Sequence, residues 1–404
     1  MTDPFIDVHC FAGGLALGVA QAGFTLVGKK EGKGAFGAAN MEANRHILGD
    51  AWQTQADLYE NWEPIDARLI VGNPPCSGFS TMSTFDPTLR GPESKLNVCM
   101  WGITEYAARV KPEIFVFESV AIAYRDGRGL MQQLRARLEA LSGEKYHLTH
   151  VLHSARSCGA PQRRERYFFV AHRVPFGMEA PDTVMLPTLR DTIADLESLS
   201  IGWEDQPYTP GPEHPQLARR HGHRADGMID GHATHVTPHV QTMMELADVV
   251  EWREGESNVD ALRRAYELGI EPPRNWQDRA DQLRKADWST SFDRVRRYVG
   301  DKPSPVVVGD SLTMNLHYKL NRTLTHREVA RIMGYPDEWR IGSLKGTPQL
   351  IRFWGKGVTV DCGRWLGTWL RNSFDGDPGT NTGEIIGDRE SLIDYKNWYK
   401  TLEK

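Results

Sequence analysis

Short apolar runs alternate with amphipathic segments along the first 180 residues, and glycine-rich or polar turns separate them. Runs rich in β-branched and aromatic residues predict buried strands, whereas apolar positions at helical spacing predict helices. Strands are expected at residues 3–9, 25–30, 68–71, 114–117, 147–152 and 167–171. Helices are expected at about 11–23, 96–110 and 130–141. This alternation is typical of βαβ units and predicts an α/β fold with a parallel sheet.

The pattern changes after about residue 181, where Arg, His, Trp and Gly become frequent and periodicity weakens. We interpret this region as a second, smaller domain. Beyond it, Thr325 and Glu328 have capping-box spacing and Gly334 follows as a C′ residue, so a short helix is expected there. The predicted division is 1–180 and 306–372 for the first domain, 181–305 for the second, and 373–404 for a C-terminal tail without an assigned function.

Composition and charge are those of an ordinary globular protein. The 404 residues are 40% hydrophobic and 25% charged, with a formal net charge of −5. No apolar run approaches the roughly 18–20 residues of a membrane span. A cytoplasmic monomer without membrane contact is therefore expected. The charge does not exclude nucleic acid, because phosphate contacts depend on local patches. Residues 217–224 form the most basic segment, which is either a DNA-backbone patch or a solvated loop.

Neither the cysteines nor the histidines have metal-site spacing. The five cysteines are scattered without a Cys-x-x-Cys pair, so no disulfide framework and no zinc site are indicated. Several histidines gather in the second region but lack His-Glu-x-x-His spacing, so no metal is expected. They are His214, His221, His223, His232, His235 and His239.

One cysteine stands at the mouth of a predicted strand. Two prolines precede Cys76 and fix φ, and Gly78 allows the backbone to bend just after it. A lone intracellular cysteine is usually a small buried hydrophobe. The rigid turn favours the other interpretation, a nucleophile held in a set direction.

Other polar residues also follow predicted strands. Glu118 comes directly after the strand 114–117, and such a position faces the ligand crevice of an open parallel sheet. The glycine turn at 9–14 opens a helix and suits a nucleotide-like cofactor, and Glu31 is placed either to accept ribose hydroxyls or to lie in solvent. Arg164 and Arg166 share one strand face, to bind a phosphate and a base carbonyl or to protect an edge strand.

Taken in order, these motifs resemble the cytosine carbon-5 DNA methyltransferases from residue 7 to about 370. The resemblance implies a doubly wound, Rossmann-like S-adenosylmethionine-dependent methyltransferase domain with a smaller target-recognition domain. It rests on the glycine turn, Glu31, Asp57, Pro74–Cys76, Glu118-x-Val120, Pro161-Gln162-x-Arg164-x-Arg166, Leu186–Asp191, Arg322-x-Leu324-Thr325-x-Arg327-Glu328 and Gly355-x-x-Val358.

The resemblance also implies roles for single residues. Cys76 would add to carbon 6 of a flipped cytosine in double-stranded DNA, and Glu118 would stabilise charge at ring nitrogen 3. Arg164, with Arg166 beside it, would hold the base carbonyl and help keep the thiol ionised. Residues expected to bind the cofactor are His9, Phe11, Ala12, Gly13, Gly14, Glu31, Asp57, Asn73, Pro74, Lys356 and Val358. Residues expected to contact substrate are Ser77, Ser80, Gln162 and Arg163.

Departures from the family pattern gather around the cofactor. His9–Gly13 replaces Phe-x-Gly-x-Gly, Gly32-Lys33 replaces an apolar residue and an acid, and Ser77 and Ser119 replace Gln and Asn. Lys356 replaces the usual Asn near the methionine end, where an ammonium would repel a sulfonium unless an anion lay between them. One hypothesis is therefore carboxy-S-adenosylmethionine as donor and 5-carboxymethylcytosine as product. Alternatively, Lys356 turns to solvent or pairs with an acid.

Three further functions stay open. The Asn73–Pro75 run is also similar to the loop of methyltransferases that act on exocyclic amines, although Cys76 replaces their aromatic residue. Some relatives with this motif set act on tRNA. A catalytically silent DNA-binding protein that kept the fold is the third alternative.

Overall fold

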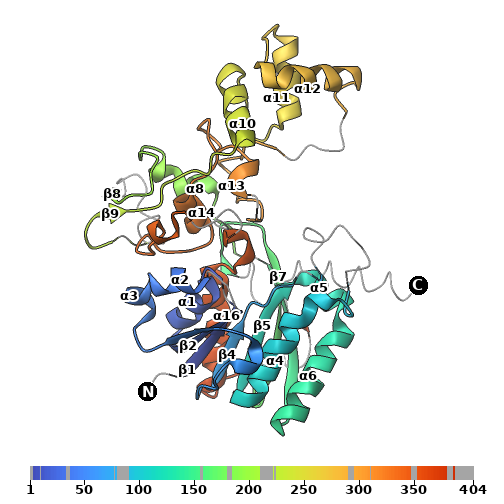
Figure 1. Cartoon of the computed structure of the whole chain (residues 1–404), viewed down its shortest axis with the longest axis vertical. Helices are drawn as coiled ribbons and strands as arrows, with labels where there is room; N and C mark the ends of the chain where they lie inside the picture. The colour runs from blue at the N-terminus through green and yellow to red at the C-terminus, as the bar shows by residue number, and fades with distance from the viewer. Residues whose placement is uncertain are drawn as a thin grey trace. The chain divides into compact units, whose positions relative to one another are not determined.

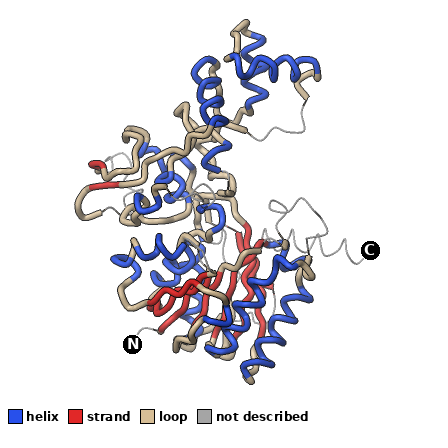
Figure 2. Tube along the Cα trace, viewed as in Figure 1, coloured by secondary structure: helices blue, strands red, loops and turns tan. Residues whose placement is uncertain are grey.

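The chain divides into two compact units, residues 1–186 with 357–404, and residues 187–356. Figures 1 and 2 show a computed structural model of the whole chain. The structure describes residues 3–9, 11–32, 37–76, 78–79, 91–154, 158–179, 184–209, 222, 224–289, 295–309, 311–346, 353–379 and 385–386.

The first unit is built on one sheet of eight strands, ordered β10-β6-β7-β5-β4-β1-β2-β3 and drawn in red in Figure 2. Neighbouring strands are parallel except that β7 runs antiparallel to β5 and β6. The bounds are β1 Pro4–Val8, β2 Thr25–Glu31, β3 Gln53–Ala56, β4 Leu69–Gly72, β5 Ile114–Val120, β6 His147–Ser154, β7 Glu165–His172 and β10 Ile385–Ile386. The predicted α/β fold is therefore confirmed.

The order of the strands creates a switch point between β1 and β4. The chain proceeds from β1 to β2 and β3 on one side, then returns to place β4 and β5 on the other side. The connections that follow β1 and β4 lead to opposite sides of this point, which leaves a crevice at the carboxyl ends of the two strands. Ligands of open α/β sheets bind in such a crevice.

Helices cover both faces of this sheet (Figure 1). On one face, α4 and α6 pack over a core that includes Ile6, Ile70, Phe117 and Phe169. On the other face, α1 and α16 pack together so closely that a Cβ at Gly18 would collide with the backbone of Arg364. The helix bounds are α1 Gly14–Gln21, α2 Gly37–Glu42, α3 Arg45–Leu48, α4 Val98–Val110, α5 Ala121–Asp126, α6 Arg128–Ser142 and α16 Val360–Phe374.

The regular structure of the second unit is mainly helices joined by long loops, although the sequence shows only weak periodicity there. Helices α10 and α11 contribute Val240, Met243, Leu246 and Leu262 to a separate apolar cluster, which α12 completes with Leu283. The bounds are α8 Leu189–Ile193, β8 Gln206–Pro207, β9 Met228–Ile229, α10 Pro238–Val249, α11 Asn258–Glu267, α12 Arg274–Lys285, α13 Ser311–Met314 and α14 His326–Ile332.

The predicted helix after the second region is present as α14. Thr325 accepts from the Glu328 N–H while the Glu328 side chain accepts from the Thr325 N–H, so the capping box is confirmed. Gly334 has φ 83° and follows the C-cap residue Met333.

This helix packs in the second unit, whereas the prediction assigned residues 306–356 to the catalytic domain. The buried Arg331 guanidinium lies 2.6 Å from Asp195 and 2.7 Å from Asp337, which holds α14 against the segment after α8. The two compact units are defined by packing, whereas the predicted domains are defined by function. The predicted functional division is therefore not tested by the compact units and stays a prediction.

Two further details differ from expectation, one in the second region and one in the tail. Most of the basic segment 217–224 lies outside the described residues, but the Arg224 guanidinium is buried between the carboxylates of Asp205 and Asp226. Arg224 is therefore not part of an exposed DNA-backbone patch, because its charge is already paired. The tail also differs: α16 extends to Phe374, and β10 pairs with β6.

Across the described ranges, no helix has both the length and the apolar character needed to cross a bilayer.

Candidate active site

The Cys76 loop begins at the switch point, where β4 ends. The Asn73 N–H donates to the Val8 carbonyl at 2.9 Å, so the loop starts beside the end of β1. The Phe79 N–H donates to the Cys76 carbonyl at 2.9 Å, which closes a turn around the cysteine. A Cβ at Gly78 would collide with Asn97 Oδ1, so any other residue there would have to displace the Asn97 side chain. The predicted turn is therefore present, and its rigidity stays a prediction.

The turn brings Cys76 to Glu118 and Arg166. Glu118 lies within β5 and Arg166 within β7, and Arg166 Nε is 2.5 Å from Glu118 Oε1. Burial and then the Glu118 carboxylate raise the pKa of the Cys76 thiol, whereas Arg166, the Val120 backbone and the Ser119 hydroxyl oppose that rise. The thiol therefore depends on Arg166 for its ionisation.

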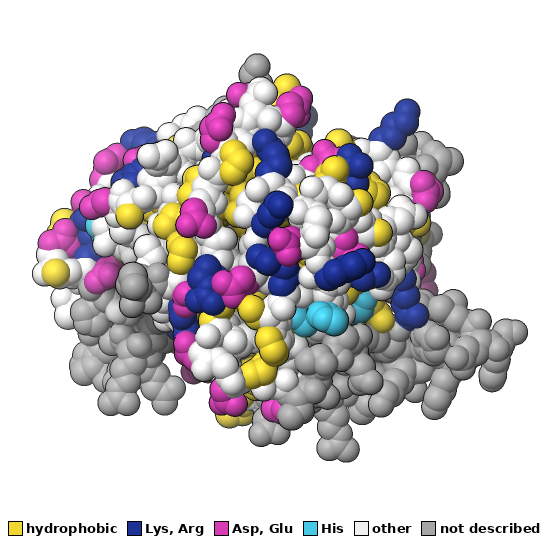
Figure 3. Space-filling view, turned by 90° about the horizontal axis from the view of Figure 1, so that it is seen from below, with side chains coloured by type: hydrophobic (Ala, Val, Ile, Leu, Met, Phe, Trp, Pro, Cys, Tyr) yellow, Lys and Arg dark blue, Asp and Glu magenta, His cyan; other side chains and the backbone are white. Residues whose placement is uncertain are grey.

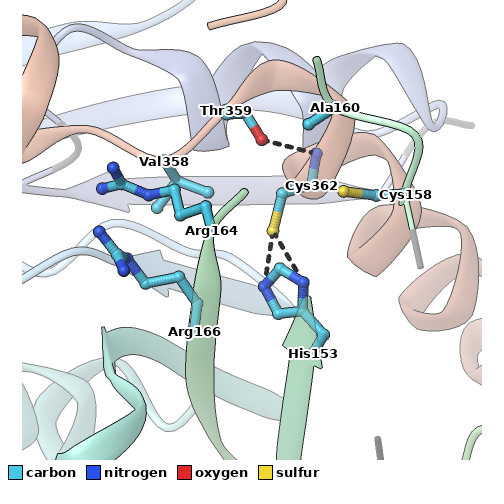
Figure 4. A pocket seen from close by; sticks show the side chains of 8 residues that line it. All are labelled: His153, Cys158, Ala160, Arg164, Arg166, Val358, Thr359 and Cys362. Carbon is cyan, nitrogen blue, oxygen red and sulfur yellow. Dashed lines mark hydrogen bonds between the residues drawn. The ribbon is translucent and has the colours of Figure 1, made fainter. Parts of the chain in front are cut away.

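Arg164 and Arg166 extend in the same direction, as predicted (Figure 4). They make different contacts, however, because Arg164 Nη2 donates to the Gly357 carbonyl at 2.7 Å. Burial, followed by the Arg166 charge, lowers the pKa of Arg164 to about 9. Arg164 interacts electrostatically with Cys76, and its predicted help in keeping the thiol ionised stays a prediction, while Arg166 is the cation that lowers the pKa of Cys76. Gln162 is buried and Arg163 is exposed.

The glycine turn follows β1 and carries the other predicted site. Gly13 adopts φ 86° as the N-cap of α1, a left-handed conformation that suits glycine. Asn40 donates to the Ala12 carbonyl at 3.0 Å, and a Cβ at Gly37 would collide with the Phe11 backbone. The turn is thus tightly packed between α1 and α2.

Glu31 is the last residue of β2, and its side chain is fully buried among polar partners. Its Oε2 lies 3.2 Å from His9 Nδ1, and His9 Nε2 lies 2.9 Å from the Tyr59 hydroxyl. Burial alone would raise the pKa of Glu31, but Lys29 and His9 bring the net shift below its usual value. The carboxylate is ionised and oriented by these contacts.

Lys29 is a site residue that sequence analysis missed. Its buried ammonium lies 2.9 Å from Asp7 Oδ2 and also contacts Glu31 Oε1. Two adjacent lysines at the end of a strand suggest solvent exposure. Lys29 is instead buried, and it lies opposite the buried Asp7 in the register of β1 on β2.

The remaining predicted residues fall into three groups. Asp57 follows β3, where its N–H donates to the Glu31 carbonyl at 3.1 Å and its Oδ1 accepts from the Leu58 N–H at 2.8 Å. Asn73, Pro74 and Val358 are buried. Ser77 and Ser80 lie outside the described residues, and Lys356 is exposed in the second unit.

The residues at the carboxyl ends of β1, β2 and β3 fit an adenosine-bearing cofactor. A glycine turn opens α1, and the ionised Glu31 lies in the adjacent strand end with Asp57 next to it. Helix N-termini and strand-end carboxylates are the groups that bind nucleotide-like ligands in such sheets.

Comparison with known proteins identifies the family. The family described as C-5 cytosine-specific DNA methylase matches residues 4–370. The chain belongs to this family. It is therefore a cytosine-5 methyltransferase by family, and S-adenosylmethionine is the methyl donor that the family uses.

Individual relatives agree with this family. Type II methyltransferase M.PspPI of Psychrobacter sp. (strain TA137) is 25% identical over 389 residues, 92% of this chain and 80% of that protein. M.AplI of Arthrospira platensis is 28% identical over 194 residues, 48% of this chain and 52% of that protein. A solved structure described as a DNA modification methyltransferase encoded within an E. coli prophage has a TM-score of 0.66 at 17% identity, covering 93% and 100% of the two chains, and shows the shared fold.

Charges of both signs are scattered over the surface that Figure 3 presents, where Lys and Arg side chains lie among Asp and Glu.

Within the described ranges, no group of three or more His, Cys, Asp or Glu side chains is arranged to hold a metal ion.

Proposed function

We propose that this cytosine-5 methyltransferase acts through a covalent bond between Cys76 and a cytosine extruded from double-stranded DNA. The observation that carries this proposal is the meeting of Cys76, Glu118 and Arg166 at the ends of β4 and β5, with Arg166 Nε 2.5 Å from Glu118 Oε1. A thiol, a carboxyl group and a guanidinium at one place suit nucleophilic addition to a ring that must accept charge.

Each group has one task in the reaction. The Cys76 thiolate adds to carbon 6, and the ring electrons move toward carbon 5 and nitrogen 3. In its protonated form Glu118 donates a proton or hydrogen bond to nitrogen 3, while Arg166 holds the Glu118 carboxyl group in position. After carbon 5 has been alkylated, a base removes its proton, the double bond reforms and the Cys76 sulfur leaves.

The bound cofactor supplies an electrophilic methyl group from its sulfonium. The glycine turn at Gly13 and the carboxylates of Glu31 and Asp57 are the groups of this chain that would hold the adenosine. His9 and Lys29 orient Glu31 through contacts on both of its oxygens. Their role is to present an ionised, fixed carboxylate.

Covalent trapping tests the mechanism. Incubation with duplex DNA that contains 5-fluorocytosine and with cofactor is expected to give a protein–DNA adduct that survives denaturing electrophoresis. Cys76→Ser should abolish the adduct, whereas Cys99→Ser, whose thiol hydrogen-bonds to Tyr59 and not to Glu118 or Arg166, should retain it. Adduct formation by Cys76→Ser, or methylation at the parent rate, would contradict the mechanism. An exocyclic-amine methyltransferase would give methylated DNA without an adduct.

The substrate is proposed to be duplex DNA, since the family acts on DNA and the second unit is large enough for target recognition. A tRNA substrate gives a different result in the same assay. Equal concentrations of duplex DNA and tRNA, each with labelled cofactor, should place the label on DNA. Label on tRNA alone would overturn this assignment, and binding without any label would indicate a silent DNA-binding protein.

A second candidate is transfer of a carboxymethyl group from carboxy-S-adenosylmethionine. The observation that favours it is Lys356, an exposed ammonium that directly precedes Gly357, whose carbonyl Arg164 holds at 2.7 Å. A carboxylate on the donor would be attracted to this charge and would offset its repulsion of a sulfonium.

Mass spectrometry of DNA modified with each donor tests this candidate. The expected result is 5-carboxymethylcytosine, and Lys356→Asn should shift the preference toward methyl transfer, with Lys345→Asn as the control lysine. Lys345 is paired with Glu204 at 2.7 Å on the surface of the second unit. A methyl product only, with the carboxylated donor inert, would rule out the candidate.

A further inference from the structure

Two thiols and an imidazole meet at the first turn of α16 (Figure 4). Cys362 is 2% exposed, and its N–H donates to Thr359 Oγ1 at 3.3 Å. His153, from β6, places Nε2 3.0 Å from Cys362 Sγ. The Cys158 side chain hydrogen-bonds to Cys362 from the segment between β6 and β7. Neither cysteine takes part in the proposed alkyl transfer.

The partners of His153 determine how the proton is shared. His153 Nδ1 lies 3.2 Å from the Ser154 carbonyl oxygen, which can only accept, so Nδ1 carries hydrogen in the neutral ring. Nε2 is then an acceptor beside Cys362 Sγ. The hydrogen bond from Cys362 lowers the pKa of Cys158 to about 6 although burial opposes it, and His153 adds to the lowering. Burial raises the pKa of Cys362. Cys158 is therefore the thiolate of the pair.

We propose that Cys158 and Cys362 are an oxidation site that closes to a disulfide when the protein meets a peroxide. The two cysteines hydrogen-bond to each other and line the same pocket, so their sulfurs are neighbours, and a disulfide forms when they approach to about 2.05 Å. In the cytosol such a bond is transient and acts as a redox sensor. The pair is separate from the catalytic cysteine.

The two steps balance with hydrogen peroxide as the oxidant. The Cys158 thiolate attacks one peroxide oxygen, the O–O bond breaks, and the leaving hydroxide takes a proton to give water and a sulfenic acid. The Cys362 sulfur then attacks the sulfenic sulfur while its proton passes to His153 Nε2. The S–S bond forms, hydroxide leaves, and the His153 proton converts it to a second water.

The disulfide would affect the site through Arg164. Cys158, Cys362, Arg164, Arg166 and Val358 line one pocket. A covalent bond between Cys158 and Cys362 ties the first turn of α16 to the segment before β7. Arg164 lies just before β7, and Gly357 lies just before α16. The disulfide therefore restrains both ends of the hydrogen bond from Arg164 to the Gly357 carbonyl. Misplacing a positioned group by about 1 Å can slow a reaction by about a hundredfold, so a smaller shift of Arg164 is expected to slow the alkyl transfer about tenfold or more.

Disulfide mapping on the unaltered chain tests the site itself. The protein is treated with hydrogen peroxide, its remaining thiols are alkylated, and the digest is analysed without reduction. A Cys158–Cys362 linked peptide, lighter by two hydrogens than its parts, is expected. Cys99, whose pKa is raised by burial, should remain alkylated and serves as the internal control. Separate alkylation of Cys158 and Cys362 after treatment would overturn the proposal, whatever reaction the enzyme catalyses.

Activity measurements test the consequence. Peroxide should lower the alkylation rate of the parent about tenfold or more, and dithiothreitol should restore it. Cys158→Ser and Cys362→Ser should keep their untreated rates after the same exposure. Equal inactivation of these variants and the parent would place the sensitive thiol at Cys76 and overturn the link to activity. Since the mapping uses the parent chain, the proposal stays falsifiable if a serine variant fails to fold.

Discussion

At the scale of single residues, the charge of Arg166 governs the nucleophile. Burial and Glu118 raise the pKa of Cys76, and Arg166 is the cation that opposes this rise while pairing with Glu118. Removing Arg166 leaves a buried carboxylate beside the thiol without its counter-charge. Ionisation of the thiol then requires a higher pH, because burial and Glu118 favour the neutral form and only the hydrogen bonds from Val120 and Ser119 still oppose them.

We therefore predict that Arg166→Gln moves the pH profile of Cys76 alkylation to higher pH by about 1–3 units. Arg166→Lys should give a smaller shift, since it keeps the charge. Iodoacetamide labelling of the Cys76 peptide at a series of pH values, read by mass spectrometry, measures the shift. Arg163→Gln is the matched control because Arg163 is the exposed arginine of the same segment. An unchanged Cys76 profile in Arg166→Gln would show that another group supplies the counter-charge.

Lys29 gives a second prediction at this scale. Lys29→Met leaves Asp7 and Glu31 as neighbouring buried carboxylates, and breaking such an arrangement costs about 3–5 kcal/mol of unfolding free energy. Urea denaturation measures this loss. The loss should shrink as pH falls, because the unpaired carboxylates then take up protons. Lys30→Met, whose ammonium bonds to Gln55 rather than to an acid, should cost less at every pH. Equal losses in the two variants would refute the role of Lys29.

The residues that could be predicted from the sequence are those fixed by local order along the chain. Cys76 and Glu118 directly follow strand patterns, so their place at the crevice follows from the sheet alone. Lys29 could not be predicted, because its partner Asp7 is brought beside it only by the register of β1 on β2. The division of tasks between Arg164 and Arg166 was also inaccessible, because it depends on the position of Gly357 almost two hundred residues away.

At the scale of elements, the packing of α1 on α16 depends on glycine. We predict that Gly18→Ala destabilises the protein by about 1–3 kcal/mol, since its Cβ would meet the α16 backbone, which cannot rotate away as a side chain can. Gly129→Ala is the matched control in α6, where a Cβ meets nothing within 4 Å. It should stabilise by about 0.5–1 kcal/mol through helix propensity. Thermal unfolding compares them, and a stabilised Gly18→Ala would show that the helices can separate at no cost.

The elements themselves were largely predictable, but their directions were not. Strands β1, β2, β4 and β5 fall where short apolar runs occur, and the capping box of α14 is visible in the spacing of Thr325 and Glu328. The antiparallel course of β7 leaves no trace in hydrophobicity, because a strand buried on both faces looks alike in either direction. Helices α11 and α12 were missed since each buries only a narrow apolar face in a polar sequence.

At the scale of the whole molecule, the first unit is assembled from two distant parts of the chain. Residues 1–186 form its sheet except for β10, while α16 arrives only after the second unit has been completed. The fold class was predictable because strand and helix alternate locally. The boundary at 356 was not, because ion pairs such as Arg331–Asp195 join residues that the sequence separates widely.

This discontinuity predicts how fragments behave. Residues 1–186 alone should be poorly soluble and should lack a cooperative thermal transition, because the face of α1 that contains Gly18 loses the cover of α16. Co-expression with residues 357–404 should restore solubility and a cooperative transition by circular dichroism, since that fragment carries α16. The matched control is the same fragment with Leu366→Asp and Leu370→Asp, which places charges at buried positions of α16. If residues 1–186 unfold cooperatively without a partner, α16 does not complete the core, and the close packing of Gly18 on Arg364 is not required for folding.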